Sequence, residues 1–209
     1  MNNVIAISHI VKINCEGRDN MKTRIILVGG FLGAGKTSLL FEAASKLTKK
    51  GKRVGLITND QAPELVDTTF LKYTNGAIKE VSGSCFCCNY KGFTDAILHL
   101  VKNQEAEIII AEPVGSCTDL SATLLQPLKD QFGKDFAIAP LTVLVDPKRL
   151  SYILDVGKSR LHPSAVYIIR KQIEEADIIV ISKTDLLTQD EVEGLKIRMA
   201  KEWPNSKIL

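Results

Sequence analysis

Short apolar runs alternate with longer amphipathic stretches along most of the chain. An unbroken apolar run that ends in glycine or polar residues predicts a buried strand of a parallel sheet. Between the runs, apolar residues recur at helical spacing, as Leu40, Ala43 and Leu47 do. The predicted strands are residues 24–28, 54–58, 77–81, 108–111, 141–145, 178–182 and 207–209, and the predicted helices are residues 36–50, 95–102, 120–129, 165–175 and 191–201.

Strands that alternate with helices predict right-handed βαβ crossovers and a mostly parallel central sheet flanked by helices, an α/β fold. The chain has 209 residues, of which 45% are hydrophobic and 24% charged, which suits one globular domain of this class. We assign residues 1–20 to an N-terminal extension and residues 21–209 to the domain. Pro127 predicts an early end for the helix over 120–129.

The charge distribution argues against nucleic acid and membrane partners. Net charge is only +3, and the densest basic stretch, residues 49–53, lies where a helix should end and where cations favour the dipole. No aromatic residues are interleaved with it. The apolar start over residues 4–13 contains His9 and Lys12, is too short for a membrane span and lacks a signal-peptide layout. We therefore expect a cytoplasmic protein.

A glycine-rich segment, GFLGAGKT at residues 30–37, lies between the first predicted strand and the first helix. Glycines allow backbone N–H groups to surround phosphate oxygens, and the helix N-terminus adds partial positive charge. In such a P-loop the lysine reaches the β- and γ-phosphates and the threonine hydroxyl binds Mg2+. The alternative is a glycine-rich turn with an incidental lysine. The predicted phosphate-binding residues are Gly30, Gly33, Ala34, Gly35, Lys36, Thr37 and Ser38.

Two acidic residues follow later strands, at the edge where ligands of open parallel sheets bind. Glu112 could hold a Mg2+-bound water, and the Gly115 amide could contact the γ-phosphate. Asp60 could position Mg2+ or the attacking water. The alternatives are a strand-ending acid before a turn, and a turn capped by Asn59 and Asp60. The predicted catalytic residues are Lys36, Asp60 and Glu112, and the predicted Mg2+ ligands are Thr37, Asp60 and Glu112.

The segment from Ser182 to Asp185 follows the strand over 178–182. An aspartate here can accept hydrogen bonds from guanine N1–H and the 2-amino group, whereas adenine presents an acceptor at N1. The stem of Lys183 can cover the face of the base. We therefore predict guanine binding by Ser182, Lys183 and Asp185.

Three of the five cysteines stand together, at Cys85, Cys87 and Cys88. In an extended segment Cys85 and Cys87 would point the same way, and a turn at Cys88 could bring a third sulfur inward. Thiolates select soft or borderline ions such as Zn2+ and Cu(I), and three protein ligands leave a tetrahedral site one position open, which suits transfer. Buried apolar cysteines and a redox disulfide are the alternatives. His99 and Cys117 are candidate fourth ligands without a recognisable spacing.

Taken in order, these motifs resemble the CobW, UreG and HypB metallochaperone GTPases, CobW-like members most of all. The resemblance extends over residues 22–209 and includes QIEEAD at 172–177, leading into KTDL at 183–186. Residues 59–62 with Asp67 align with an Asn-Glu-Phe-Gly segment and a later aspartate of the family.

The resemblance implies a three-layer P-loop NTPase fold and a nucleotide-dependent homodimer. It also implies binding of GTP or GDP, of Mg2+, and of Zn2+ or another soft divalent ion. The implied partner is a client metalloenzyme or metal acceptor, in metalloenzyme or cobalamin-related metal insertion. In the implied mechanism GTP and Mg2+ order the loops near Asp60 and Glu112, which reshapes the thiolate site, and hydrolysis releases metal or partner.

Four features depart from the family pattern. Ser182 stands in place of an asparagine, which removes an amide bond to guanine. Either Ser84 replaces the glycine that usually precedes the cysteines or the loop is one residue longer, and residues 113–114 replace a small polar pair. The chain also ends near the last predicted strand, so either the usual C-terminal domain and any histidine-rich tail are expected to be missing or this is a trimmed form.

Two other functions remain open. The chain could be a nucleotide-dependent assembly or regulatory partner of a corrinoid enzyme, with structural cysteines. A small-molecule kinase would need an arginine-rich lid, but Arg149, Arg160 and Arg170 are scattered along the sequence. Because no arginine finger is evident in cis, we expect slow hydrolysis without a partner.

Overall fold

A parallel β-sheet runs through the part of the chain that the computed structural model describes, residues 22–59, 77–81, 84–155 and 161–209. Its strands are β1 (Thr23–Gly30), β2 (Val54–Asn59), β3 (Ala77–Val81), β4 (Ile108–Glu112), β5 (Phe136–Ile138), β6 (Thr142–Val145), β7 (Ile178–Ile181) and β8 (Lys207–Ile208). They lie in the order β3-β2-β4-β1-β6-β7-β8, and β5 pairs with the beginning of β1. Every pairing among these strands is parallel.

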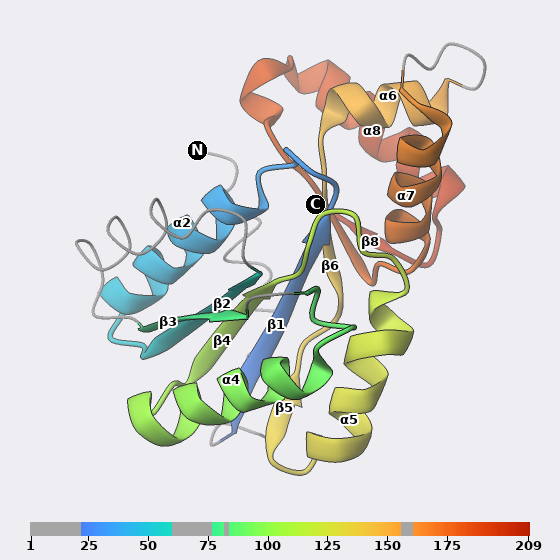
Figure 1. Cartoon of the computed structure of the whole chain (residues 1–209). Coiled ribbons are helices and arrows are strands. Elements are labelled where there is room, and N and C mark those ends of the chain that lie inside the picture. The colour runs from blue at the N-terminus through green and yellow to red at the C-terminus, as the bar shows by residue number, and fades with distance from the viewer. Residues whose placement is uncertain (1–21, 60–76, 82–83, 156–160) are drawn as a thin grey trace.

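Helices cover both faces of this sheet (Figure 1). They are α2 (Lys36–Lys49), α4 (Tyr90–Gln104), α5 (Gln126–Phe132), α6 (Pro147–Leu154), α7 (Pro163–Glu174) and α8 (Gln189–Glu202), with a π-helical turn at Ser121–Leu125 and a 3-10 turn at Thr184–Leu186. Side chains of β1 alternate between the faces, as a strand requires. Ile26 and Val28 pack in the core layer that contains α2, while Ile25 and Leu27 pack in the layer that contains α4, α5 and α7. The described chain therefore has the predicted three layers.

The middle of the sheet brings three loops to one edge. β1 lies between β4 and β6, with Leu27 opposite Ala111 and Gly30 opposite Leu144. Because the strands are parallel, their carboxyl ends meet at the same edge. The segments that follow β1, β4 and β6 are thereby placed side by side.

The structure confirms the predicted fold class, and it adds two elements that the pattern did not predict. β5 has only three residues, too few for a periodicity to register. α6 has eight residues and begins at the Asp146 N-cap, whose carboxylate accepts hydrogen bonds from the backbone N–H groups of Lys148 and Arg149. In addition, α4 begins at Tyr90, earlier than predicted, because Asn89 caps it by accepting from the Gly92 N–H at 3.0 Å.

Pro127 does not end its helix early. The chain makes a π-helical turn at Ser121–Leu125, and α5 then starts at Gln126, so Pro127 lies in the first turn. The Gln126 N–H donates to the Ser121 carbonyl, five residues back. Proline is tolerated in a first turn because it lacks an N–H that would have no intrahelical partner there.

Among the described helices, none combines the length and the apolar character that a membrane crossing requires. The proposed N-terminal extension, residues 1–20, and the predicted site residue Asp60 lie outside the described ranges, as does Asp67.

Candidate functional site

The phosphate-loop residues adopt backbone conformations that favour glycine. Gly30, Gly33 and Gly35 have φ values of 135°, 76° and 92°. A Cβ at Gly30 would lie 2.6 Å from the Leu144 carbonyl oxygen, so β6 also requires glycine there. Ala34 is buried, and its N–H donates to the Phe31 carbonyl at 3.0 Å. The turn delivers the chain directly into α2, as the sequence predicted.

Lys36, Thr37 and Glu112 form a contact between the phosphate loop and the end of β4. The Lys36 ammonium lies 3.6 Å from Glu112 Oε1, and only 6% of the lysine side chain is exposed. The Thr37 hydroxyl donates to both Glu112 oxygens, at 3.0 and 2.9 Å. Three of the residues predicted to serve phosphate and Mg2+ are therefore in contact, while Ser38 is exposed beside them.

Burial shifts the pKa of both charged groups in this contact. Desolvation lowers the pKa of Lys36, although the Glu112 carboxylate opposes the shift. Desolvation likewise raises the pKa of Glu112 against the effect of Lys36 and Thr37. Each charge is thus incompletely compensated by its protein partners, which suits a site that receives phosphate and Mg2+.

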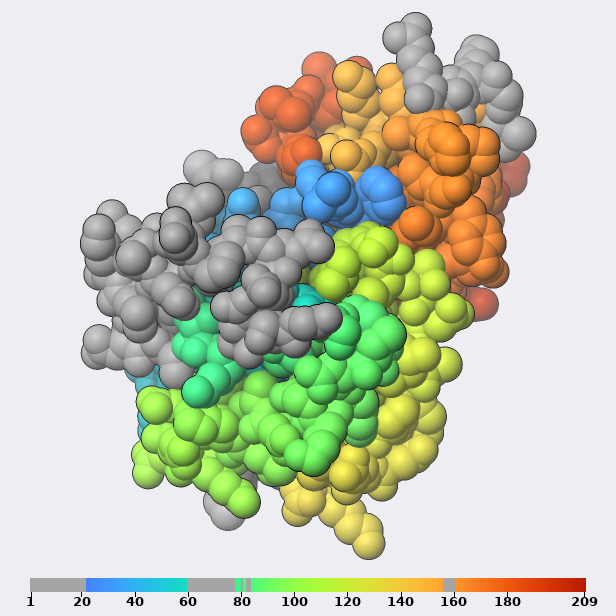
Figure 2. Space-filling model, in the orientation of Figure 1, coloured from blue at the N-terminus to red at the C-terminus, as the bar shows by residue number. Residues whose placement is uncertain are grey.

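Gly115 packs directly against the phosphate loop. A Cβ at this position would lie 2.8 Å from the Leu32 backbone nitrogen and 3.2 Å from the Lys36 ammonium nitrogen. Only a residue without a side chain allows this approach. In the space-filling view, the blue segment that contains the loop reaches the surface next to the yellow-green segment after β4 (Figure 2).

The segment predicted to bind guanine follows β7. Asp185 is exposed in the 3-10 turn at Thr184–Leu186, and Lys183 has a left-handed backbone with φ of 52°. The Lys183 ammonium lies 2.7 Å from Asp146 Oδ2, which fixes its stem beside the start of α6. Ser182 is buried, and its hydroxyl donates to the Val145 carbonyl at 3.1 Å. Ser182 therefore secures the end of β6 in this structure.

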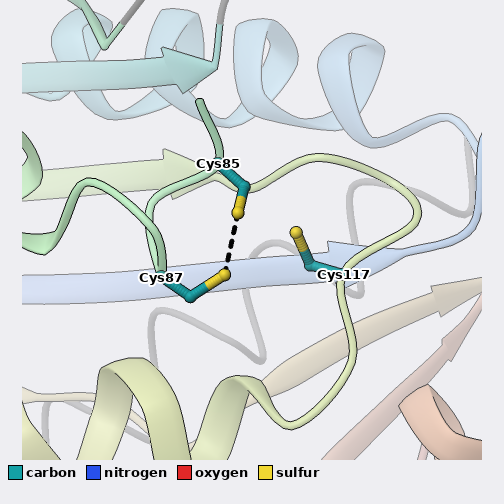
Figure 3. A group of neighbouring side chains, drawn as sticks. All are labelled: Cys85, Cys87 and Cys117. Carbon is teal, nitrogen blue, oxygen red and sulfur yellow. Dashed lines mark hydrogen bonds between the residues drawn. The ribbon is translucent and has the colours of Figure 1, made fainter. Parts of the chain in front are cut away.

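Three thiols from two loops gather near the same edge (Figure 3). The sulfur atoms of Cys85, Cys87 and Cys117 all lie within 4.8 Å of one another, and the Cys85 and Cys87 sulfurs are 2.9 Å apart. All three are half-buried free thiols. Cysteine sulfur is a ligand for Zn2+ and Cu(I), and the group offers three such ligands.

Cys88 is placed differently from its two neighbours in the sequence. Its side chain is exposed, and it is not part of the three-thiol group. Its N–H donates to the Cys85 carbonyl at 3.0 Å, in the turn that leads into α4. His99 is also elsewhere, on α4, where its ring interacts with Asn103. Of the two candidate fourth ligands, the structure brings Cys117 to the cluster.

Hydrophobic and polar anchors fix the cysteine segment. Phe86 is fully buried and stacks on Phe93 of α4, with ring centroids 4.5 Å apart. The Asn59 amide donates to the carbonyls of Val81 and Ser84, at 2.9 and 2.8 Å. Because Phe86 points into the core, Cys85 and Cys87 are left on its outer side. Asn59 thus acts as an anchor at the end of β2.

The thiols lower or raise one another's pKa values. Burial acts to raise the pKa of Cys85, but hydrogen bonds with Cys87, Cys88 and Cys117 outweigh it and lower the pKa to about 7. Burial and the Cys85 charge raise the pKa of Cys87 to about 11, and burial also raises that of Cys117. One thiolate, at Cys85, therefore forms near neutral pH and is stabilised by its neighbours.

In the metal-free, reduced protein we expect Cys85 to be alkylated by iodoacetamide with half-maximal rate near pH 7. Below this pH the thiol is protonated and unreactive, and above it the thiolate attacks. Peptide mass spectrometry after timed quenching resolves Cys85 from exposed Cys88, whose pKa is raised and which serves as the internal comparison. A half-maximal rate at Cys85 no lower in pH than at Cys88 would contradict this pattern.

Two residues of the site were missed by sequence reasoning. Arg149 of α6 donates from Nη1 to the Leu32 carbonyl, and its Cζ lies 5.1 Å from the Phe31 ring centroid. An arginine of the same chain therefore lies over the phosphate loop, although the sequence gave no sign that Arg149 would approach this loop. The Asp-Pro pair that begins α6 was the available signal, since it indicates a helix start directly after β6, the strand that pairs with β1.

Gln172 of α7 is the second missed residue. Its side-chain nitrogen donates to the carbonyls of Gly115, at 3.1 Å, and Cys117, at 2.8 Å. Only 1% of Gln172 is exposed. Gln172 begins the QIEEAD stretch, but nothing in that stretch indicates which loop it would hold.

Comparison with known proteins agrees with this architecture. The family model CobW/HypB/UreG, nucleotide-binding domain, matches residues 24–209. The zinc chaperone YeiR of Escherichia coli is 28% identical over 182 residues, covering 83% of this chain and 50% of YeiR. Zinc-regulated GTPase metalloprotein activator 1 of Schizosaccharomyces pombe is 25% identical, covering 88% of this chain and 44% of its own.

Solved structures show the same fold. The Zn(II)-bound YjiA GTPase of E. coli superposes with a TM-score of 0.63 at 20% identity, covering 90% of this chain and 57% of YjiA. HypB of Helicobacter pylori in complex with nickel gives 0.58 at 16% identity, covering all of this chain and 86% of HypB. This chain spans about half the length of the curated relatives it matches. On the family model's match, the chain belongs to the CobW/HypB/UreG family through its nucleotide-binding domain.

Proposed function

We propose that this chain binds and hydrolyses GTP and that its nucleotide state controls a Zn2+ site made of cysteine thiolates, from which the metal passes to a client metalloenzyme. The observation that carries the proposal is that the end of β4 and the loop that follows it contribute to both sites. Glu112, the last residue of β4, contacts Lys36 and Thr37, and Cys117 of the loop lies with Cys85 and Cys87. The names of the relatives, which include zinc chaperones and a zinc-regulated GTPase, support the same cargo.

The residues present fit a magnesium nucleotide. Thr37 and Glu112 supply a hydroxyl and a carboxylate, the oxygen ligands that Mg2+ prefers, and they already lie within 3.0 Å of each other. We propose that these two residues, with Asp60, hold Mg2+, which neutralises phosphate charge when bound. The turn with positive φ at Gly33 and Gly35 directs backbone N–H groups towards the phosphates, and Lys36 adds a cation from a largely water-excluded position.

The proposed catalytic steps use residues that already lie together. Lys36 stabilises the charge that develops on the transferred phosphoryl group. Glu112 would hold Mg2+ and a water bound to it, and the Gly115 N–H would contact the γ-phosphate. Loss of that phosphate releases the segment after β4.

The family resemblance further implies a homodimer that forms when nucleotide binds. Sedimentation of the chain with GTP and with GDP would detect such a dimer.

Guanine selectivity is assigned to the exposed carboxylate of Asp185. Replacing Asp185 by alanine is expected to weaken GTP binding roughly 10- to 100-fold, because hydrogen bonds to a charged group contribute about 1.5–3 kcal/mol. ATP binding should not weaken, since adenine offers no matching donors. Calorimetry with both nucleotides measures the effect, and Asp190→Ala, in the first turn of α8, is the matched exposed control.

The experiment that tests the proposed function is calorimetry of GTP, GDP and ATP binding, each with and without Zn2+. We expect GTP to bind more tightly than ATP, and Zn2+ to change the affinity for GTP. Equal affinities for GTP and ATP would overturn the guanine assignment. An unchanged GTP affinity in the presence of Zn2+ would overturn the coupling, because coupling between two binding sites is reciprocal.

A further inference from the structure

Arg149, in the first turn of α6, lies over the phosphate loop of its own chain. Its Nη1 donates to the Leu32 carbonyl, and its Cζ lies 5.1 Å from the centroid of the Phe31 ring. We propose that Arg149 is a catalytic residue for the nucleotide of its own chain: its guanidinium donates to γ-phosphate oxygens of bound GTP and stabilises the charge that develops during hydrolysis. This inference rests on the proposed function, because it adds a residue to the proposed GTPase site.

The guanidinium contacts the part of the loop that lies near Lys36. A Cβ added at Gly33 would lie 3.4 Å from Arg149 Nη2, so a second nitrogen also packs on the loop. A Cβ added at Gly115 would lie 2.8 Å from the Leu32 backbone nitrogen and 3.2 Å from Lys36 Nζ. The Leu32 backbone and the Lys36 ammonium are therefore neighbours, and Arg149 brings a second cation to the same part of the loop.

The two cations share one carboxylate. Glu112 lies 3.6 Å from the Lys36 ammonium, whereas no carboxylate of the described residues lies within ion-pair distance of the Arg149 guanidinium. Desolvation is the main cause that lowers the pKa of Lys36, and the charge of Arg149 adds to this lowering. Two cations with one counter-charge favour a bound polyanion, such as the phosphates of a nucleoside triphosphate.

The Arg149 side chain retains donors for such a ligand. A guanidinium is always charged in proteins and carries five N–H donors in a fixed, planar fork. Among the described residues, its one hydrogen-bond acceptor is the Leu32 carbonyl, which Nη1 uses. Arginine commonly binds phosphate through two parallel N–H bonds. The remaining donors can therefore bind a phosphate while the contact with the loop persists.

The start of α6 is fixed at the residue that carries this side chain. The Asp146 carboxylate accepts from the backbone N–H groups of Lys148 and Arg149, at 2.9 and 3.3 Å. The same carboxylate lies 2.7 Å from the Lys183 ammonium, and Leu150 is fully buried. Asp146 thus connects Arg149 to the segment that is proposed to bind guanine.

In the proposed step, a water oxygen forms a bond to the γ-phosphorus, and the bond from this phosphorus to the bridging oxygen breaks. The electron pair of the broken bond stays on the β-phosphate of GDP, and one proton of the water passes to the released phosphate. Arg149 neither gives nor takes a proton. Its N–H groups donate to oxygens whose negative charge grows as the bond breaks, so they stabilise the transition state more than bound GTP.

A purely structural role of Arg149 predicts a different result. If Arg149 only held the loop through Leu32, its loss would weaken binding of GTP and GDP alike, and bound GTP would be hydrolysed at the unmodified rate. If Arg149 stabilises the transition state, its loss lowers the rate for bound GTP. The affinity for GDP then stays unchanged, because GDP has no γ-phosphate.

The test compares Arg149→Ala and Arg149→Lys with the unmodified chain in single-turnover hydrolysis of saturating GTP with Mg2+. We expect Arg149→Ala to hydrolyse bound GTP roughly 10- to 100-fold more slowly, the range for losing hydrogen bonds to a charged group. Arg149→Lys keeps the charge without the fork and should lose less. Lys148→Ala, the exposed neighbour on α6, is the matched control and should hydrolyse GTP at the unmodified rate.

Two further measurements distinguish catalysis from loss of folding. Added guanidinium ion, below the concentration that unfolds the chain, should restore part of the rate to Arg149→Ala and none to Arg149→Lys, whose ammonium fills the place. Calorimetry should give the same GDP affinity for both variants as for the unmodified chain. Far-ultraviolet circular dichroism shows whether each variant is folded.

A mixing experiment tests whether Arg149 acts on the nucleotide of its own chain. Arg149→Ala chains are mixed with Lys36→Met chains, so that each chain retains the residue that the other lacks. We expect the mixture to hydrolyse GTP at the sum of the two separate rates. If Arg149 acted on the nucleotide of a second chain, the mixture would regain activity, and the assignment within one chain would be overturned.

The outcomes separate this inference from the proposed function. An Arg149→Ala rate equal to that of Lys148→Ala, together with slow hydrolysis by Lys36→Met, would overturn the role of Arg149 alone. Equal losses of GTP and GDP affinity with an unchanged rate for bound GTP would also overturn only that role. If the unmodified chain hydrolysed no GTP, the proposed function itself would be overturned.

Discussion

Replacing Lys36 by methionine is expected to lower the rate of GTP hydrolysis by about 100- to 1,000-fold. This is the usual effect of removing one preorganised hydrogen-bond donor to the charge that develops in a transition state. Lys36 is the buried cation of the phosphate loop, with 6% of its side chain exposed and its ammonium 3.6 Å from Glu112. Methionine keeps an apolar stem of similar length, so the packing of α2 is retained. Single-turnover hydrolysis of GTP with Mg2+ measures the effect.

The control for this substitution is Lys46→Met on the same helix. Lys46 is partly exposed and pairs with Glu42 one turn away, so its loss affects only a surface ion pair. Its hydrolysis rate should equal that of the unmodified chain. A Lys36→Met rate within about tenfold of the control would mean that the loop does not bind the transferred phosphate in the proposed way.

Replacing Glu112 by glutamine is expected to lower GTP hydrolysis by at least about 100-fold and to raise the Mg2+ concentration needed for half-maximal rate. Glutamine has the same size and can still accept a hydrogen bond from Thr37, but it lacks the charge that Mg2+ requires. Burial raises the pKa of Glu112, so this carboxylate is protonated as pH falls, before exposed glutamates are. Hydrolysis by the unmodified chain should therefore decline on the acid side, and the variant should lack that decline.

Glu107→Gln is the matched control, because Glu107 precedes β4 at the opposite edge of the sheet and pairs with Lys52. Titration of Mg2+ in both variants, at several pH values, separates a metal role from a general loss of folding. An unchanged Mg2+ requirement in Glu112→Gln would remove Glu112 from the metal site.

Much of the fold was predictable because buried parallel strands have unbroken apolar runs. Strands such as β4 and β7 consist of such runs, and α2 follows its glycine-rich loop with clear helical spacing. The sequence carries less information about short elements. β5 is too short to show a period, and α6 is specified by its Asp146 cap and Pro147 rather than by periodicity.

The candidate site was predictable where its residues lie at the carboxyl end of a predicted strand or directly after it. The phosphate loop and Glu112 were placed together by strand polarity alone, and the structure puts them in contact. Cys117, Arg149 and Gln172 were not predictable in this way, because their roles depend on which loops meet across the sheet. Cys117 and Cys85 are far apart in sequence, and their contact exists only once β2, β4 and α4 have assembled.

The most direct test of coupling between nucleotide and metal is the zinc affinity of the unmodified chain, measured by chelator competition with Mg2+ and either GDP or a non-hydrolysable GTP analogue. The proposal predicts that the two affinities differ by roughly 5- to 150-fold, the usual range for coupling between two sites. Equal zinc affinities in the two nucleotide states would contradict it.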